Sequence, residues 1–307
     1  MAILKRAKSE ARRVADAVSW LRAMWVRRKQ LPQLPGHFYS PVYGPTDVDR
    51  FREQRAAQLA DEDLPGIDLH VADQLALLAE LAQYHDAAYF VGAAPTSNRY
   101  RFENDYFTWG DAVFYRTLIA HIRPSRIVEI GSGYSTALAL DTLDDFAIDA
   151  TMTLIEPYPE RLETVLSPAD LARVKLLRAD AQTVDLGVFD QLQPGDILFV
   201  DSSHVTRLGS DVNRLVFDVL GRLPAGVWIH FHDICYPFEY PLEWIEEFRA
   251  WNEAYLVRAF LEFNSSFCIA LWVNYLTVHH PEKLRSRFAP ALDHPDGGGS
   301  LWLRKVR

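Results

Sequence analysis

The stretch EIGSGYST, residues 129–136, ends an apolar run and opens a segment with helical spacing. Gly131 and Gly133 permit a tight backbone turn, and the helix that follows begins with unpaired N–H groups. In an open sheet of parallel strands, a turn of this kind holds a nucleotide-like ligand. The fingerprint of dinucleotide-binding proteins has a third glycine, where this chain has Thr136. The stretch therefore predicts a nucleotide-type cofactor site and argues against NAD.

Around this turn, from about residue 112 onward, short apolar strands alternate with helical segments, which predicts a parallel sheet. The expected strands are 126–131, 152–156, 174–180, 196–201 and 227–233, followed by a late pair at 266–274 and 299–306. The expected helices are 135–145, 158–166, 185–193, 206–222 and 241–259. We therefore expect an α/β fold with a Rossmann-like, seven-stranded, mostly parallel sheet and an N-terminal helical extension.

The region before the sheet has a different character. Residues 1–30 predict a basic amphipathic helix with a net charge of +7, and since the whole chain carries −9, the remainder carries −16. Such a helix packs on its own domain or on a second subunit of a homo-oligomer, or it lies on an anionic membrane surface. Residues 31–46 are rich in proline and glycine and predict a linker or draped arm. Helical patterns at 47–60 and 69–90 then predict an extension over 47–111 that covers the cofactor site, before a cofactor-binding domain at 112–307.

The composition narrows the class of protein. An acidic body is a poor general binder of nucleic acid, because phosphate contacts need clustered lysines and arginines. Cys235 and Cys268 are the only cysteines and both lie in apolar context, which favours a reducing, cytoplasmic compartment over a disulfide framework. No apolar run approaches the roughly 18 residues of a membrane span, and the N-terminus lacks the pattern of a signal peptide. We therefore expect a globular, cytoplasmic protein that does not bind nucleic acid.

Acidic side chains end the second and third expected strands. Glu156 is placed to accept hydrogen bonds from the two hydroxyls of a ribose, and Asp180 to accept one from an adenine amino group. Each could also be a solvated loop residue, because strand ends are commonly polar. Together with the glycine turn, these strand ends predict a site for a cofactor that contains adenosine.

The fourth and fifth strands also end in polar residues, DSSH (201–204) and HFHD (230–233). Side chains alternate along a strand, so His230 lies one repeat deeper than His232 and is expected to be a hydrogen-bonded core residue. Asp201, His232 and Asp233 could together hold a divalent ion, with Mg²⁺ favoured and Mn²⁺ or Fe²⁺ as alternatives. In the alternative interpretation, the first aspartate caps a turn and the second begins a loop.

The motifs EIGSGYST, LIEPYP, RADAQ and LFVDSSH have the order and spacing of class I S-adenosylmethionine (SAM)-dependent methyltransferases, which the chain resembles over about residues 100–276. The resemblance is strongest to a bacterial branch with an EIGSGYST-type first motif and an HFHDI-type fifth strand. It implies SAM as the cofactor, bound by residues at the strand ends and just upstream of the first strand: Glu129, Gly131, Ser132, Gly133, Glu156, Asp180, Ala181, Asp201, Phe107 and Asp111.

The chain is also similar to metal-dependent small-molecule O-methyltransferases. In these families the position three after the strand-four aspartate holds a Lys or His general base, which corresponds to His204 here. A neutral imidazole at this position could remove a proton from an acceptor hydroxyl. The families take two further metal ligands from a pair at the end of strand five, usually carboxylates or amides. This chain departs from that pattern, because the first member of its pair is His232, followed by Asp233.

Aromatic side chains follow the fifth strand in CYPFEYPLEW (235–244). The four aromatic side chains Tyr236, Phe238, Tyr240 and Trp244 could line the pocket for an acceptor substrate, or they could pack the next helix against the sheet. The leading interpretation is a metal-assisted, SAM-dependent O-methyltransferase that acts on a small hydroxylated acceptor of the sugar or natural-product type. The alternative is metal-independent O- or N-methylation. A non-haem iron hydroxylase is a third interpretation, because two histidines and a carboxylate can form such a site.

Overall fold

The computed structural model describes residues 33–90, 98–289 and 297–307. The chain divides into two compact units, Met1–Arg55 and Ala56–Arg307. The helix expected at residues 1–30 lies outside the described residues. Residues 33–44 form turns, and helix α2 (Pro45–Ala60) follows them. None of the helices in the described ranges combines the length and the apolar character needed to cross a membrane.

The second unit is built on a seven-stranded sheet with the strand order β3-β2-β1-β4-β5-β7-β6. The strands are β1 (Arg126–Ile130), β2 (Thr151–Ile155), β3 (Val174–Leu177), β4 (Ile197–Val200), β5 (Trp228–Phe231), β6 (Phe267–Trp272) and β7 (Leu301–Lys305). The first five strands run parallel, whereas β7 is antiparallel to both β5 and β6. This arrangement confirms the predicted fold class, including the late antiparallel pair.

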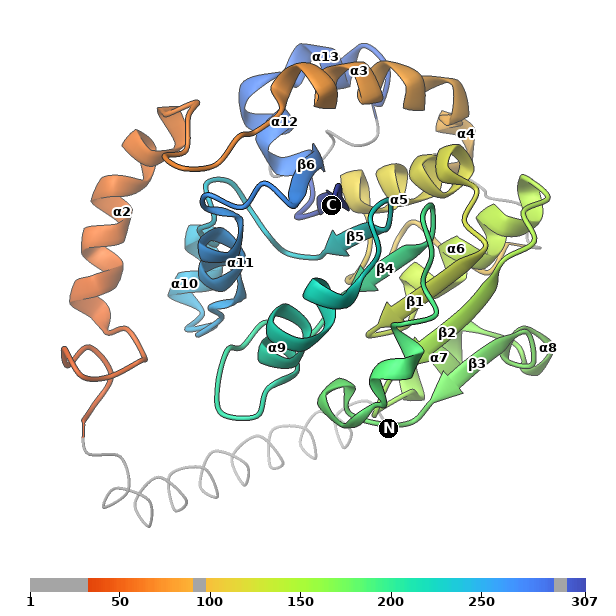
Figure 1. Ribbon diagram of the computed structural model, residues 1–307. Helices are drawn as coiled ribbons and strands as arrows, with labels where there is room; N and C mark the ends of the chain where they lie inside the picture. The colour runs from red at the N-terminus through yellow and green to blue at the C-terminus, as the bar shows by residue number, and fades with distance from the viewer. Residues whose placement is uncertain (1–32, 91–97, 290–296) are drawn as a thin grey trace, which may run out of the picture. The chain divides into compact units, whose positions relative to one another are not determined.

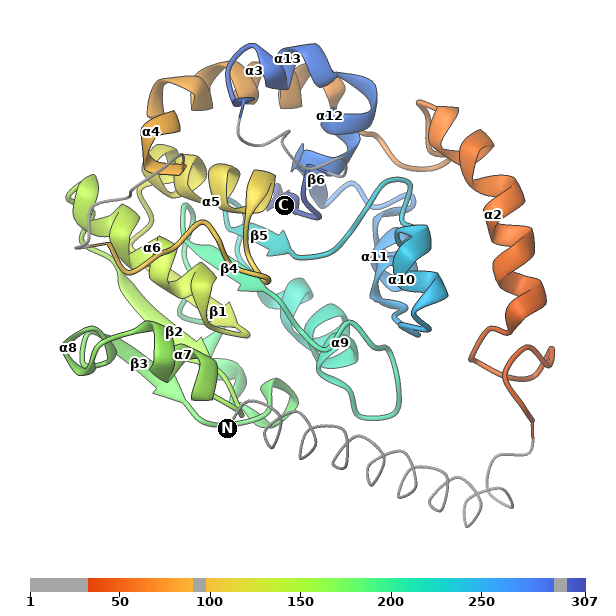
Figure 2. The same cartoon turned by 180° about the vertical axis from the view of Figure 1, so that it is seen from behind.

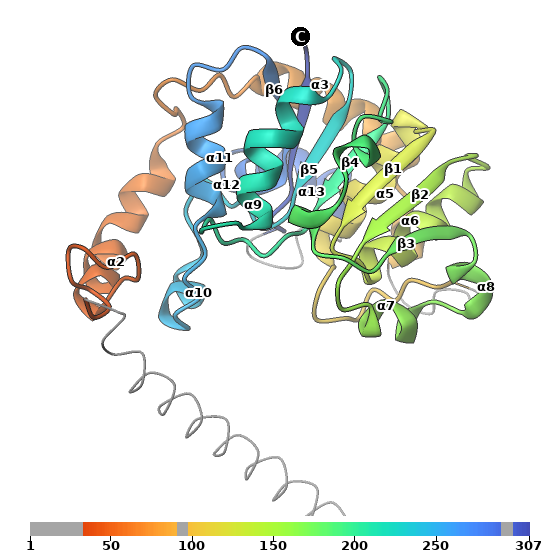
Figure 3. The same cartoon turned by 60° about the horizontal axis from the view of Figure 1, so that its bottom comes forward.

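Helices cover both faces of the sheet, which is why its central strands are continuous apolar runs. Every residue of β4 and β5 is buried. Helices α5 (Trp109–Ile122) and α6 (Tyr134–Asp145) lie on one face, and α9 (Asp211–Arg214) lies on the other (Figures 1 and 2). Helix α11 (Glu253–Leu261) lies on the same side as α9 (Figure 3). The other α-helices of this unit, within the described ranges, are α3 (Val71–Leu81), α4 (Ala87–Phe90), α7 (Glu160–Val165), α8 (Pro168–Leu171), α10 (Leu242–Glu246), α12 (Val273–His279) and α13 (Pro281–Arg285).

Several expected helices are shorter or broken. The helix predicted at 185–193 is wrong, because only a 3₁₀ turn forms there, at Leu186–Val188. The segment 206–222 becomes helical only at Asp211. The segment 241–259 divides into α10 and α11, and the left-handed backbone of Phe248, with φ 59°, lies in the break. The segment 69–90 likewise divides into α3, a 3₁₀ turn and α4.

Candidate active site

The glycine turn after β1 lies against the end of β4. Gly131 has a φ of 76°, and a Cβ atom on this residue would lie 2.2 Å from the backbone oxygen of Asp201. Glycine is the residue that tolerates both this conformation and this close approach. The N–H of Gly131 donates a hydrogen bond to the backbone oxygen of Ile155 at 3.1 Å. The turn therefore joins the ends of β1, β2 and β4.

Glu129 supports the turn from inside the protein. Its side chain is fully buried and accepts hydrogen bonds from the hydroxyls of Ser135 and Thr136 on the first turn of α6. Thr136 Oγ1 also accepts a hydrogen bond from the N–H of Gly133 at 3.2 Å. Burial raises the pKa of Glu129 to about 8, although the two hydroxyl donors act in the opposite direction. The carboxyl group thus fixes the start of helix α6 from the protein interior.

A pocket of about 580 Å³ lies at the carboxyl ends of β1 to β4. Its lining includes five of the residues predicted to bind the cofactor: Gly131, Glu156, Asp180, Ala181 and Asp201. Glu156 Oε2 accepts a hydrogen bond from the N–H of Ser132 at 3.0 Å, and Oε1 accepts one from the N–H of Tyr158 at 2.8 Å. The acidic strand ends expected from the sequence therefore converge on one cavity.

Two residues that we expected over the cofactor lie on the far side of His232. The ring of Phe107 is buried, and its centroid lies 5.5 Å from that of His232. Asp111 accepts a hydrogen bond from the hydroxyl of Ser300 at 2.6 Å, and its Oδ2 lies 3.6 Å from His232 Nε2. Asp111 lines a second pocket, of about 470 Å³, whose lining also includes Asn104, Asp105, Tyr106, Thr108, His232, Asp233, Cys235 and Trp244.

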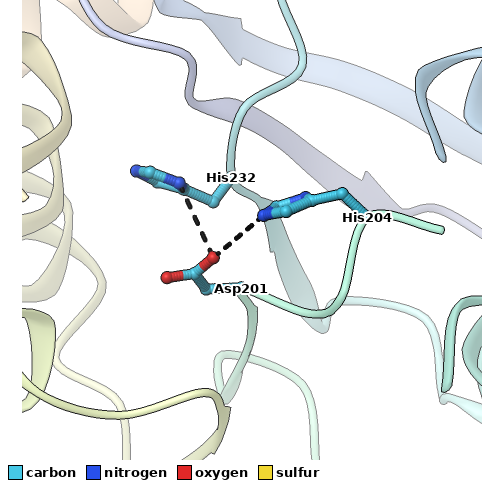
Figure 4. Close-up of side chains that lie close together, drawn as sticks. All are labelled: Asp201, His204 and His232. Atoms are coloured by element: carbon cyan, nitrogen blue, oxygen red, sulfur yellow. Dashed lines mark ion pairs between the residues drawn. The ribbon is translucent and has the colours of Figure 1, made fainter. Parts of the chain in front are cut away.

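The ends of β4 and β5 bring two histidines onto one carboxylate (Figure 4). Asp201 Oδ1 lies 3.3 Å from His204 Nε2 and 3.7 Å from His232 Nδ1. Burial disfavours the charged carboxylate of Asp201, but the two histidines outweigh this and lower its pKa to about 2. Asp201 lines the first pocket and His232 the second, so this cluster lies between the two pockets.

His204 is held from behind by Glu253. Its Nδ1 lies 2.8 Å from Glu253 Oε2, and the Glu253 carboxylate is buried and also accepts a hydrogen bond from the hydroxyl of Ser202. The N–H groups of Asn252 and Glu253 both donate to the backbone oxygen of His204, which fixes the start of α11 at this point. Burial opposes the charged imidazole, but hydrogen bonds to Asp201 and Glu253 outweigh burial and raise the pKa of His204 to about 10.

His232 is buried, and neither of its ring nitrogens has a hydrogen-bond partner. Three carboxylates surround the ring without meeting the geometry of a hydrogen bond. They are those of Asp111, Asp201 and Asp233, and Asp233 Oδ1 lies 3.3 Å from His232 Nδ1. Burial acts against protonation, yet Asp233 and Asp201 raise the pKa of His232 well above its usual value. His204 and Asp233 both have left-handed backbones, with φ 58° and 59°. Such strain in residues other than glycine concentrates at functional sites.

His230 confirms the expectation of a core histidine. Its Nε2 lies 2.9 Å from the hydroxyl oxygen of Ser300, and its ring stacks on Phe199 with 4.0 Å between centroids. Burial lowers the pKa of His230 well below its usual value, so this imidazole is neutral. The iron-hydroxylase interpretation therefore gains no ligand from this residue.

The aromatic residues after β5 take the packing role that was one of our two expectations. Tyr236, Phe238 and Tyr240 are all buried, and none of them belongs to the lining of the second pocket. Phe238 packs on Trp272 with ring centroids 4.5 Å apart, and the hydroxyl of Tyr240 accepts a hydrogen bond from the N–H of Ala254. Their predicted contact with an acceptor has no support in this geometry.

Sequence reasoning did not find Glu253 as a member of the site. No sequence motif around Glu253 indicates its role, because the break between α10 and α11 is what brings it next to His204. Of the four aromatic residues that could line an acceptor pocket, Trp244 is the one that belongs to the lining of the second pocket.

Comparisons with known proteins agree with this geometry. A family model described as "Methyltransferase domain" matches residues 128–234. An uncharacterized protein of Archaeoglobus fulgidus is 36% identical over 165 residues, which make up 52% of this chain and 73% of that protein.

Solved structures of methyltransferases overlap with the chain at low identity. A structure of CmcI with Mg and SAM has a TM-score of 0.39 at 18% identity, over 64% of this chain and 72% of that chain. The O-methyltransferase TomG from Streptomyces achromogenes, in complex with SAM, has a TM-score of 0.40 at 16% identity, over 75% and 88%. The plantazolicin methyltransferase BamL has a TM-score of 0.41 at 10% identity, over 78% and 100%.

The residues matched by the family model run from β1 to the end of β5, and so contain the whole edge of the sheet at which the first pocket lies. The Archaeoglobus relative is similar to this chain over about half of its length. The chain therefore belongs to the class I SAM-dependent methyltransferases.

Proposed function

We propose that this enzyme is an O-methyltransferase that methylates a hydroxyl group of a small hydroxylated acceptor, of the sugar or natural-product type. The observation that carries the proposal is the closeness of one residue from each of the two pockets. Asp201 lines the first and His232 the second, and 3.7 Å separates Asp201 Oδ1 from His232 Nδ1. A cofactor in the first pocket and an acceptor in the second would face each other at this pair.

The first pocket has the donors and acceptors for the cofactor. Glu156 would accept hydrogen bonds from the ribose hydroxyls, and Asp180 and Ala181 would bind the adenine end. Glu129, Gly131, Ser132 and Gly133 would form the turn that surrounds the methionine end. When bound, SAM supplies an electrophilic methyl carbon.

The second pocket favours an acceptor that is neutral or cationic. It is lined by the carboxylates of Asp105, Asp111 and Asp233, and no lysine or arginine is among its lining residues in the described ranges. Carboxylates accept hydrogen bonds from hydroxyl groups. Tyr106 and Trp244 add flat apolar surfaces against which a sugar or an aromatic ring can pack. An anionic acceptor would meet three like charges.

Methylation of a hydroxyl group also requires that its proton be removed. The place between the two pockets where Asp201, His204 and His232 lie, which we call the junction, fits a divalent ion for this purpose. His232 has two buried ring nitrogens without hydrogen-bond partners and lies close to Asp201. A bound ion would lower the pKa of the acceptor hydroxyl. From the sequence, Asp201, His232 and Asp233 would hold the ion, and His204 would take the proton.

Metal-independent methylation is the second candidate. It is favoured by the buried pair of His204 and Glu253, since a carboxylate behind an imidazole is also the arrangement that orients a general base.

Calorimetry with S-adenosylhomocysteine (SAH) tests the cofactor pocket, and we expect binding; no binding at millimolar concentration would contradict the proposal. The acceptor class is tested by transfer of radiolabelled methyl groups from SAM to panels of neutral glycosides, amino sugars, phenols and sugar acids. We expect transfer to oxygen on a neutral or cationic compound. Transfer confined to nitrogen or to sugar acids would contradict it.

A further inference from the structure

The side chains at the junction form a group that can bind a metal ion. We propose that His204 is a metal ligand rather than the general base, that it binds the ion together with Asp201 and His232, and that the site selects a transition-metal ion over Mg²⁺. This inference deepens the proposed function by naming the ion class and its ligands. It rests on that proposal only in placing the ion beside the acceptor.

The three side chains come from two segments of the chain, the end of β4 with the loop after it and the end of β5. One nitrogen from each histidine and one oxygen of Asp201 all lie within 4.8 Å of one another. Both imidazoles approach the same carboxylate group, His204 from the loop after β4 and His232 from the end of β5 (Figure 4). Two imidazole nitrogens and one carboxylate oxygen around a common point form a donor set for a divalent cation.

Each histidine also has a carboxylate at its other nitrogen. Glu253 Oε2 lies 2.8 Å from His204 Nδ1, and Asp111 Oδ2 lies 3.6 Å from His232 Nε2. A histidine that binds a metal almost always presents its second ring nitrogen to a carboxylate, a carbonyl or a water, which fixes the orientation of the ring. His204 has this arrangement with Glu253, and the carboxylate of Asp111 lies near the second nitrogen of His232 without a hydrogen bond to it.

The position of His204 argues against the role of a base for the acceptor. Its side chain is only 7% exposed, and within the described part of the chain it belongs to the lining of neither pocket. Its Nε2 points at Asp201 and its Nδ1 at Glu253. Neither nitrogen is therefore free to face a hydroxyl group in the second pocket.

Asp233 differs from His204 in its relation to the second pocket. It lines the second pocket, where an acceptor hydroxyl would lie. It does not belong to the group whose ligand atoms all lie within 4.8 Å of one another. We therefore assign Asp233 to the acceptor, as a hydrogen-bond partner for its hydroxyl group.

The donor set determines the class of ion. Mg²⁺ prefers oxygen ligands and retains several of its waters, whereas imidazole ligands suit Fe²⁺, Co²⁺ and Zn²⁺. With two imidazoles among three protein ligands, the site should discriminate against Mg²⁺.

The experiment is a calorimetric titration of the metal-free chain with Co²⁺, Zn²⁺ and Mg²⁺, combined with the visible absorption spectrum of the Co²⁺ form. We expect Co²⁺ and Zn²⁺ to bind at least about tenfold more tightly than Mg²⁺. Equal or tighter binding of Mg²⁺, or no binding of any ion at millimolar concentration, would overturn the inference.

Variants separate the ligands from their neighbours. His204→Ala and His204→Gln should each weaken Co²⁺ binding by more than ~100-fold, which exceeds the loss typical for a residue that only orients a ligand. They should also change the Co²⁺ spectrum. Asp233→Asn should cost less than ~10-fold and leave the spectrum intact. The opposite order, with Asp233→Asn more damaging than His204→Gln, would restore His204 as the base and overturn the assignment.

SAH binding, measured on the same preparations, shows that each variant is folded and tests the proposed function separately. If SAH binds and the ions do not, only the metal assignment fails. If the ions bind as expected and SAH does not, the proposed function fails and the metal site remains.

Discussion

Glu253 and His204 form a buried pair in which 2.8 Å separates Glu253 Oε2 from His204 Nδ1, although the two residues are 49 positions apart in the chain. The pair connects the first turn of α11 to the loop after β4. It therefore makes the geometry of the junction depend on a helix that contributes no other residue to it. The first prediction concerns this connection.

In the metal-free protein, Glu253→Ala should reduce the free energy of unfolding by about 3–5 kcal/mol at neutral pH, because removal of one partner from a buried ion pair is strongly destabilising. The effect should depend on pH. The folded state holds the His204 proton with a pKa of about 10, against an ordinary value of 6.5, so the contribution is complete below about 6.5 and is lost as pH rises through about 10. Urea unfolding across this range measures the effect. Glu262→Ala, which removes a half-buried pair with Arg258 at the end of the same helix, is the control and should cost at most about 1 kcal/mol. Equal losses for the two variants would contradict the prediction.

Replacement of Glu156 by glutamine should weaken the binding of SAH. The substitution keeps the size of the side chain but removes the charge that would accept hydrogen bonds from the ribose hydroxyls. Hydrogen bonds to a charged group contribute about 1.5–3 kcal/mol, which corresponds to a loss of affinity of at least about tenfold. Calorimetry with SAH measures the loss. Glu160→Gln, on the first turn of α7 and outside the first pocket, should leave affinity unchanged.

Gly131→Ala should damage the cofactor edge of the sheet. The added Cβ would meet the backbone oxygen of Asp201 at 2.2 Å in a left-handed conformation, so the turn must move. Backbone strain of this kind costs about 1–3 kcal/mol before the clash is counted. Gly221→Ala is the matched control, because no atom lies within 4 Å of its added Cβ. Thermal unfolding and SAH titration should distinguish the two variants, and comparable behaviour would show that the turn tolerates a side chain.

Glu129→Gln should change how stability depends on pH. Burial raises the pKa of Glu129 to about 8, from an ordinary value of 4.5, so the folded protein binds more protons than the unfolded chain between these values. Its stability therefore falls as pH rises through this window. The glutamine variant lacks this ionisation. The difference in free energy of unfolding, variant minus wild type, should therefore increase from about pH 4.5 to about pH 8 and stay constant above that. Denaturant titrations at several pH values check this, and a constant difference between the two proteins would contradict it.

Much of the fold could be predicted from the sequence, because the parallel strands are short apolar runs that end at polar residues. The glycine turn at 131–133 was recognisable because its residues serve a local conformation. The break between α10 and α11 was not, since the aromatic and apolar residues of 241–259 suit one continuous helix equally well. The helix predicted at 185–193 was wrong for a similar reason. Helical spacing suggested a full helix there, but Asp185 accepts a hydrogen bond from the N–H of Gly187 and caps a short turn instead.

The candidate site was predictable to the extent that it lies at strand ends. Glu156, Asp180, Asp201 and His232 could be placed because parallel strands deliver their carboxyl ends to one edge. The partners of the histidines could not, because Glu253 and Asp111 approach from helices on opposite faces of the sheet. Alternation along β5 correctly separated His230 from His232, but it could not show on which side of His232 Asp111 would lie.

The two pockets draw on different stretches of the chain. The lining of the first comes from residues 130–211, and that of the second from 104–111 and 232–299, with no residue in common. A lineage of such enzymes can therefore change its acceptor through mutations in the second set while it inherits the first unchanged. Chimeric proteins that exchange residues 104–111 and 235–299 between relatives would be the direct way to transplant one acceptor preference onto another cofactor scaffold.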